Sequence, residues 1–151
     1  MNDRFKFRAW YYDKDDENDS DNNKMFYNAQ DTYDCLGGNP PLRASSFGDI
    51  IDDERWVVEQ CTGLRDKNGK LIYEGDILRS ESYPFKSDNE YHYAAEVCFD
   101  EESAVFFYYV FRTSTKVAGR AEGNTGELNE CDWEIIGNIH ENADLSEVEN
   151  D

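Results

Sequence analysis

Residues 59–78, EQCTGLRDKNGKLIYEGDIL, carry the clearest local structural signal in the chain. Asn68-Gly69 favours a tight turn with two residues at positive φ, because Gly has no Cβ and Asn tolerates the left-handed region. Apolar segments flank this turn at 56–58 and 71–73, and Gly75 supplies a second turn or bulge before Ile77. We therefore predict a strand, a polar turn over 65–70, a returning strand and a further strand, which is typical of the entry into a small β-barrel.

Three segments of the sequence carry recognisable motifs. Residues 61–77 are similar to the pattern T-G-L-x-D-x-N-G-K-x-I-[YF]-E-G-D-I. RFKFRAW at 4–10 and WEIIGNIHEN at 133–142 match two further motifs, and the three occur in the same order as in a known family. Together they resemble the YopX family of small phage and prophage proteins over nearly the whole chain. The resemblance implies the family's architecture, but the family carries no established activity that transfers to particular residues.

The composition indicates one domain that is mainly β. A chain of 151 residues can bury about two thirds of its unfolded surface in a single core. Aromatic residues make up 15%, which favours strands because flat rings pack well on a pleated surface. Phe5, Phe7 and Ala9 alternate with cations at 4, 6 and 8, and this period of two predicts a first strand with a solvated cationic face.

We therefore expect a mainly β fold with one short helix, in the form of a small, partly closed, SH3-like antiparallel barrel with an N-terminal extension. The whole chain, 1–151, is expected to be a single domain. Within it, 1–55 are expected to form an N-terminal hairpin and the helix, 56–140 the barrel, and 141–151 an acidic tail.

The short helix is predicted to follow Ser45 or Ser46, either of which can cap it. Phe47, Ile50 and Ile51 have helical spacing and are expected to share its buried face, with the helix ending near Glu54.

Both faces of the segment 105–111 are apolar: Val105, Phe107, Tyr109 and Phe111 lie on one, and Phe106, Tyr108 and Val110 on the other. Such a strand is either sandwiched between two layers or buried in a subunit contact, because monomers rarely expose so large an apolar patch. Both options stay open, and the second predicts a homo-oligomer. Our candidate partner contacts are Phe106, Tyr108 and Val110, taken as the face that the core does not need, and the turn residues Asp66, Lys67 and Asn68.

The chain is strongly acidic, with 34 acidic and 15 basic side chains and a formal net charge of −19. A negative field repels phosphates, so nucleic-acid binding is disfavoured. Many of the acids lie in an apparent loop, 13–21, and in the tail, 141–151. Calcium-loop registers that start at Asp13, Asp15 or Asp19 lack the required Gly and Glu, so we expect a mobile hairpin loop there.

The sequence contains no run of about 20 apolar residues and no apolar core of a secretion signal at its start. We therefore expect no membrane contact. Together with the resemblance, this places the protein in the cytoplasm of an infected or lysogenic host cell.

No pattern of reactive residues indicates an enzyme, a metal site or a cofactor. The four cysteines show no C-x-x-C pair, so we expect free thiols. His92 and His140 lie in no recognisable catalytic frame and are expected to be surface or interface residues. Asp132 and Glu134 share a strand face, where two exposed acids are usually solvated.

We therefore expect a phage or prophage accessory protein that acts without catalysis, through protein contacts, as a homo-oligomer or with a host or phage protein. One alternative is an acidic DNA mimic that captures a host DNA-binding or defence protein, although a mimic needs its acids on a rigid face. The other alternative is a nucleic-acid-binding SH3-like barrel, which the net charge opposes.

Overall fold

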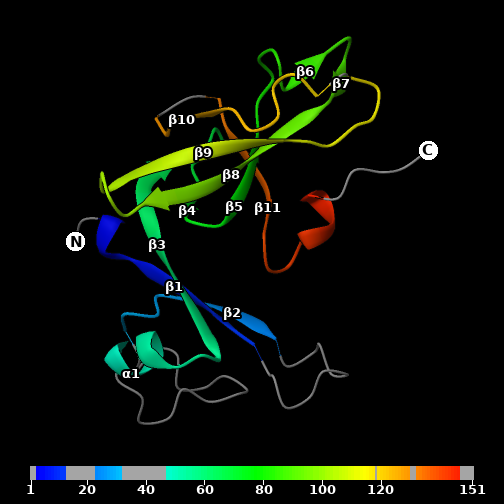
Figure 1. Cartoon of the computed structure of the whole chain (residues 1–151). Coiled ribbons are helices and arrows are strands. Elements are labelled where there is room, and N and C mark those ends of the chain that lie inside the picture. The colour runs from blue at the N-terminus through cyan, green and yellow to red at the C-terminus, as the bar shows by residue number, and fades with distance from the viewer. Residues whose placement is uncertain (1–2, 13–22, 32–46, 118, 130–131, 147–151) are drawn as a thin grey trace. The chain divides into compact units, whose positions relative to one another are not determined.

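The computed structural model describes residues 3–12, 23–31, 47–117, 119–129 and 132–146 (Figure 1). These residues form a mainly β protein with one short α-helix, α1 (Phe47–Asp52), so the predicted fold class is confirmed. The chain divides into two compact units, 1–61 and 62–151. The first unit extends beyond the predicted boundary at residue 55, because the following strand pairs with the N-terminal strand. Whether the two units make one domain stays a prediction.

The N-terminal unit is built on a central strand. A 3₁₀ turn, η1 (Asp3–Phe5), leads into β1 (Phe7–Tyr11), which pairs antiparallel with β2 (Lys24–Tyr27) and with the first half of β3 (Trp56–Arg65). The predicted returning strand at 25–27 is therefore confirmed. The core is apolar and aromatic, and it consists of Ala9, Tyr11, Ala29, Ile50 and Trp56 with Phe7, Phe26, Phe47 and Val58 packed against them.

The prediction of a solvated cationic face on the first strand is wrong for Arg8. Its side chain is only 1% exposed, and its Nε lies 2.9 Å from Oε1 of Glu59, the residue opposite it on β3. Burying an arginine is costly unless a carboxylate pairs with it, and Glu59 is 3% exposed itself. The strand also begins later than predicted, since Phe5 belongs to η1 and is 57% exposed.

Fewer residues of the short helix are buried than the spacing of its apolar residues predicted. Ile50 is 1% exposed and Phe47 packs on the same core, but Ile51 is 54% exposed and does not contribute. The helix ends at Asp52, before the predicted end near Glu54. The predicted caps at 45 and 46 and the acidic loop at 13–21 lie outside the described residues.

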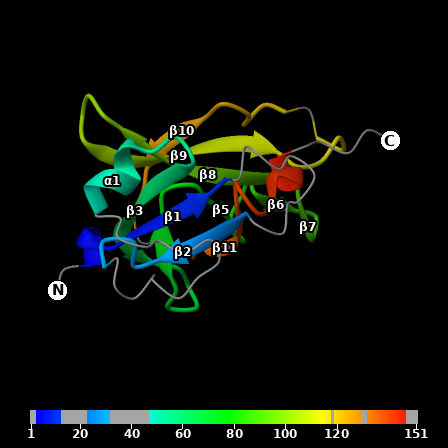
Figure 2. The same ribbon diagram turned by 90° about the horizontal axis from the view of Figure 1, so that it is seen from below.

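The C-terminal unit centres on a five-stranded antiparallel sheet, in the order β10-β9-β8-β5-β11. Its strands are β5 (Asp76–Arg79), β8 (Tyr93–Asp100), β9 (Val105–Arg112), β10 (Thr125–Glu127) and β11 (Glu134–Asn138). The sheet curls, so that β5 and β11 run steeply across β8 and β9 (Figure 1), while β8, β9 and β10 lie side by side (Figure 2). SH3-like closure of this half-barrel stays a prediction.

Shorter elements complete the unit. The strand β4 (Leu71–Tyr73) returns beside β3, a small hairpin joins β6 (Lys86–Ser87) to β7 (Glu90–Tyr91), and a 3₁₀ turn, η3 (Ala143–Ser146), follows β11. The core consists of Ile72, Leu78, Phe85, Tyr93, Ala95, Val97, Val110, Ala121, Leu128 and Trp133.

The hairpin between β3 and β4 confirms the predicted turn but not its conformation. The N–H of Gly69 donates to the carbonyl of Asp66 at 3.0 Å, and the N–H of Asp66 donates to the carbonyl of Lys70 at 2.8 Å. Gly69 has a φ of +82°, whereas Asn68 is not in the left-handed region. A turn with a single left-handed residue forms a bulged loop, so the prediction of two positive φ angles is wrong. The predicted turn at Gly75 is confirmed, since residues 74–75 form a turn between β4 and β5, and Gly75 has a φ of +86°.

Candidate functional site

The predicted contact residue Asp66 is a structural acceptor. It is 7% exposed, and its carboxylate accepts hydrogen bonds from the backbone N–H of Asn68 and Lys70, both at 2.9 Å, and of Ile135 at 3.1 Å. Burial by itself would raise the pKa of Asp66, but the three backbone donors and the Lys70 charge outweigh it and lower the pKa. The side chain thus fixes the turn and attaches it to β11. Of the three predicted turn contacts, Lys67 and Asn68 are the exposed ones.

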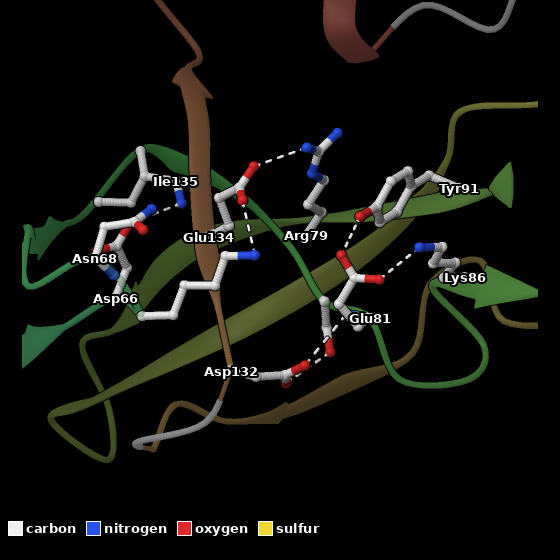
Figure 3. Close-up of polar contacts among 11 residues, drawn as sticks. Asp66, Asn68, Arg79, Glu81, Lys86, Tyr91, Asp132, Glu134 and Ile135 are labelled. Atoms are coloured by element: carbon white, nitrogen blue, oxygen red, sulfur yellow. Dashed lines mark hydrogen bonds and ion pairs between the residues drawn. The ribbon is translucent and has the colours of Figure 1, made fainter. Parts of the chain in front are cut away.

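Lys67 belongs to an ionic network along β11 and β5 (Figure 3). Its Nζ lies 2.9 Å from Oε2 of Glu134, and Nη2 of Arg79 lies 2.7 Å from the other oxygen of the same carboxylate. The hydrogen bond with Lys67 is the main reason why the pKa of Glu134 is lowered. The guanidinium of Arg79 also lies over the ring of Tyr91, 4.2 Å from its centre.

The network continues around Tyr91. Its hydroxyl hydrogen-bonds to Glu81, whose carboxylate also accepts from Nζ of Lys86 at 2.6 Å. Those two contacts, the lysine first, lower the pKa of Glu81. These residues hold the β6–β7 hairpin beside β5, and their charges are compensated within the network.

Asp132 and Glu134 do not form an acid pair. Asp132 accepts from Oγ of Ser80 at 2.8 Å and from the N–H of Glu81 at 3.2 Å, whereas Glu134 holds Lys67 and Arg79. Each carboxylate therefore serves a different partner within the fold.

The face of β9 that was predicted to be free of the core packs on it, so that premise is wrong, while partner contact there stays a prediction. Val110 is 3% exposed and belongs to the core, and Phe106 and Tyr108 pack against that core. The ring centre of Tyr108 lies 5.2 Å from that of Trp133, which the sequence places 25 residues away. This face is needed for the fold, and a partner reaches little of it.

The opposite face of β9 is the accessible one. Val105 is 37% exposed and Tyr109 44%, and Phe107 and Phe111 alternate with them at half-buried positions. We call these four residues the outer stripe. Acids border it: Glu96 lies opposite Tyr109 and Asp100 opposite Val105 on β8, and Glu127 lies opposite Phe107 on β10.

The described residues include two thiols and two imidazoles. Cys61 and Cys98 are free, as predicted, and Cys35 and Cys131 lie outside the described residues. Among the described residues no group of three or more His, Cys, Asp or Glu side chains is placed to hold a metal ion. His92 is 4% exposed, so the expectation of a surface or interface histidine is wrong for it.

The described residues define a mainly β protein with a curled sheet, and none of their groups of His, Cys, Asp and Glu side chains is placed to hold a metal ion. The chain belongs to the YopX family, because the model of that family, described as YopX protein, matches residues 6–147. No curated protein matches. Among solved structures the chain is similar to protein EF1440 from Enterococcus faecalis, with 22% identity, a TM-score of 0.44, and coverage of 94% of this chain and 97% of that chain. No helix in the described part is both long and apolar enough to cross a membrane.

Proposed function

We propose that this YopX-family protein acts without catalysis, by binding a basic partner protein on the outer stripe of β9. The setting we propose is the one that the family resemblance implies, an accessory protein of a phage or prophage in the host cytoplasm. The observation that carries the proposal is the exposure of Val105 and Tyr109 on a strand whose other face already serves the core.

Aromatic side chains on a rigid sheet are well suited to protein contacts. Phe107 and Tyr109 supply large contact areas at low cost in side-chain entropy, and Tyr109 adds a hydroxyl for a hydrogen bond. Neighbouring strands hold β9 on both sides along 107–109, so the stripe is organised before a partner arrives.

The charge around the stripe selects the occupant. Glu96, Asp100 and Glu127 border it on both sides, and the chain carries −19 overall. A second copy would bring acids against acids, whereas a partner with Lys and Arg around an apolar centre would complement them. We therefore favour a basic protein over the homo-oligomer that the sequence predicted. Host DNA-binding proteins have this chemistry, so the proposal includes the capture of such a protein.

The test uses two variants that leave the net charge unchanged. Val105→Ser with Tyr109→Ser removes apolar contact from the stripe, and Tyr83→Ser removes an aromatic ring that is 84% exposed elsewhere in the same unit. Tagged wild type and both variants are used to capture proteins from a bacterial lysate. Each retained protein is identified by mass spectrometry, purified and titrated against the three forms.

The expected result is a basic protein that wild type and Tyr83→Ser bind equally, and that the stripe variant binds about tenfold or more weakly, a loss of about 1.4 kcal/mol. Equal binding to all three forms would show that charge alone attracts the partner and would refute the role of the stripe. Light scattering after size exclusion tests whether the stripe binds a second copy of the chain instead. A wild-type multimer that becomes a 17.6 kDa monomer in the stripe variant would replace the basic partner with a second copy.

A further inference from the structure

A second feature of the C-terminal unit is a cavity of about 280 Å³ beside Arg79. Tyr93 and Ala94 at the start of β8 line it, as do Ile136 of β11 and Leu145 of η3. At roughly 30 Å³ per water molecule, its volume corresponds to about nine waters. That is the size range of an amino acid.

A bulge in β11 helps to form this cavity. Ile135 lies opposite Leu78 and Gly137 lies opposite Ile77, so Ile136 is an extra residue with no partner position on β5. Bulges change the direction in which a side chain points, and Ile136 lines the cavity. A regular strand would have continued to alternate its side chains between the two faces of the sheet. The extra residue of the bulge instead supplies an apolar part of the cavity wall.

Arg79 presents a fixed cation to the cavity. Glu134 holds its Nη2 at 2.7 Å, and the ring of Tyr91, which also lines the cavity, lies under the guanidinium. In Figure 3 the guanidinium lies between Glu134 and Tyr91, and its other terminal nitrogen points away from Glu134. Nε is buried and has no hydrogen-bond partner among the described residues. A planar guanidinium in this position is ready to receive a carboxylate.

Asp144 presents the opposite charge. It lies on η3, lines the same cavity and is exposed, and no ion pair joins it to Arg79 or to another described residue. Thr113, just after β9, adds a hydroxyl to the lining. The cavity is therefore lined by an anion, a cation, three residues that carry hydroxyls and three apolar residues.

The charges decide what kind of ligand suits this arrangement. Glu134 already compensates Arg79, and Asp144 adds a further negative charge, so a phosphate or another anion meets net repulsion. A zwitterion has no net charge for the field of −19 to repel. Its carboxylate suits Arg79, its ammonium suits Asp144, and an apolar side chain suits Ile136 and Leu145.

We propose that this cavity binds a free α-amino acid with an apolar side chain, with Arg79 as the carboxylate ligand and Asp144 as the ammonium ligand. This site is independent of the outer stripe, and neither proposal needs the other.

The test titrates the isotope-labelled chain of 151 residues with L-leucine and follows backbone amide signals by NMR. Three related probes change one ligand group each: leucinamide lacks the carboxylate, N-acetyl-leucine lacks the ammonium, and glycine lacks the apolar side chain. We expect L-leucine to shift the signals of Ala94, Thr113 and Leu145, and each probe to bind about tenfold or more weakly. The probes act on wild type, so the result does not depend on whether a variant folds.

Asp144→Asn is expected to weaken the binding of leucine about tenfold. The matched control is Glu141→Gln, because Glu141 is an exposed acid that does not line the cavity. No response to leucine up to about 10 mM would overturn the proposal, because the interaction would then be weaker than about 3 kcal/mol. Equal binding of leucinamide or N-acetyl-leucine would refute the assigned carboxylate or ammonium contact. Glycine binding as tight as that of leucine would refute selection for an apolar side chain. An equal loss of leucine affinity in Glu141→Gln would show that the effect of Asp144→Asn comes from the overall negative charge of the chain.

Discussion

Replacing Asp66 with Asn tests how much one buried carboxylate contributes to the C-terminal unit. Wild-type Oδ1 accepts from Asn68 and Lys70, and Oδ2 accepts from Ile135. An Asn can keep one oxygen for the two turn amides, but its NH₂ group then faces the N–H of Ile135. Hydrogen bonds to a charged acceptor contribute about 1.5–3 kcal/mol each, and a buried donor without an acceptor costs about 1–3 kcal/mol. We expect Asp66→Asn to lower the free energy of unfolding by about 3 kcal/mol.

The same change should remove a dependence on pH. Because folding lowers the pKa of Asp66, the unfolded chain binds the proton more tightly than the folded chain. The stabilisation is therefore complete above the unfolded pKa, about 4, and is lost as the pH falls through the lower folded value. The difference between wild type and Asp66→Asn should be constant from pH 7 to about pH 5 and should shrink in stronger acid.

The assay is unfolding in urea, which is monitored by hydrogen exchange and mass spectrometry of peptides from 62–146. Those peptides report on the C-terminal unit separately from the N-terminal one. Asp88→Asn is the matched control, because it makes the same charge change at an exposed position in the turn between β6 and β7. A loss below about 0.5 kcal/mol in Asp66→Asn, or an equal loss in Asp88→Asn, would refute the role of the three hydrogen bonds.

Three further predictions follow from packing and charge. Gly126→Ala places a Cβ on the phenol of Tyr108, and it should cost about 1–3 kcal/mol of unfolding free energy in a denaturation experiment; an unchanged midpoint would contradict this. Glu59→Gln removes the carboxylate beside the buried charge of Arg8 and should cost about 3 kcal/mol or more, measured by hydrogen exchange in the N-terminal unit; a loss typical of surface sites would count against it. Burial is the main cause that raises the pKa of Cys98 to about 12, so iodoacetamide should label it much more slowly at pH 8 than a free thiol, and labelling at the free rate would disprove this.

The sequence predicted the elements near the Asn68-Gly69 turn well, because the signals there are local. The apolar runs at 56–58 and 71–73 and the break at Gly75 appear in the structure as expected. The sequence predicts Asp66 as a partner contact and misses its structural role. Nothing near it in the chain indicates that its third hydrogen-bond donor is the backbone N–H of Ile135, 69 residues later. A tertiary hydrogen bond of this kind has no local pattern.

The two faces of β9 show a different limit. Periodicity places Phe106, Tyr108 and Val110 together but cannot say which face is inside when both are apolar. Trp133 and Val97 decide this by packing against that side. Phe106→Asp with Tyr108→Asp would therefore disrupt the core, so a change of solution mass in that variant would not by itself identify an oligomer contact.

The satisfied charges of this protein help to locate its function by exclusion. Lys67 and Glu134 are conspicuous charges, yet they are paired within the fold, so removing either would weaken the fold before it weakened the binding of a ligand. Arg79 is paired through Nη2, and its other terminal nitrogen points away from Glu134 (Figure 3). Groups kept for binding are expected where the fold leaves them accessible without a partner of their own. By that criterion Tyr109 on the outer stripe and Asp144 beside the cavity are the positions where substitution should alter binding while the free energy of unfolding stays nearly constant. A loss of stability at either position comparable to that of Asp66→Asn would show that this separation between structural and binding groups is wrong.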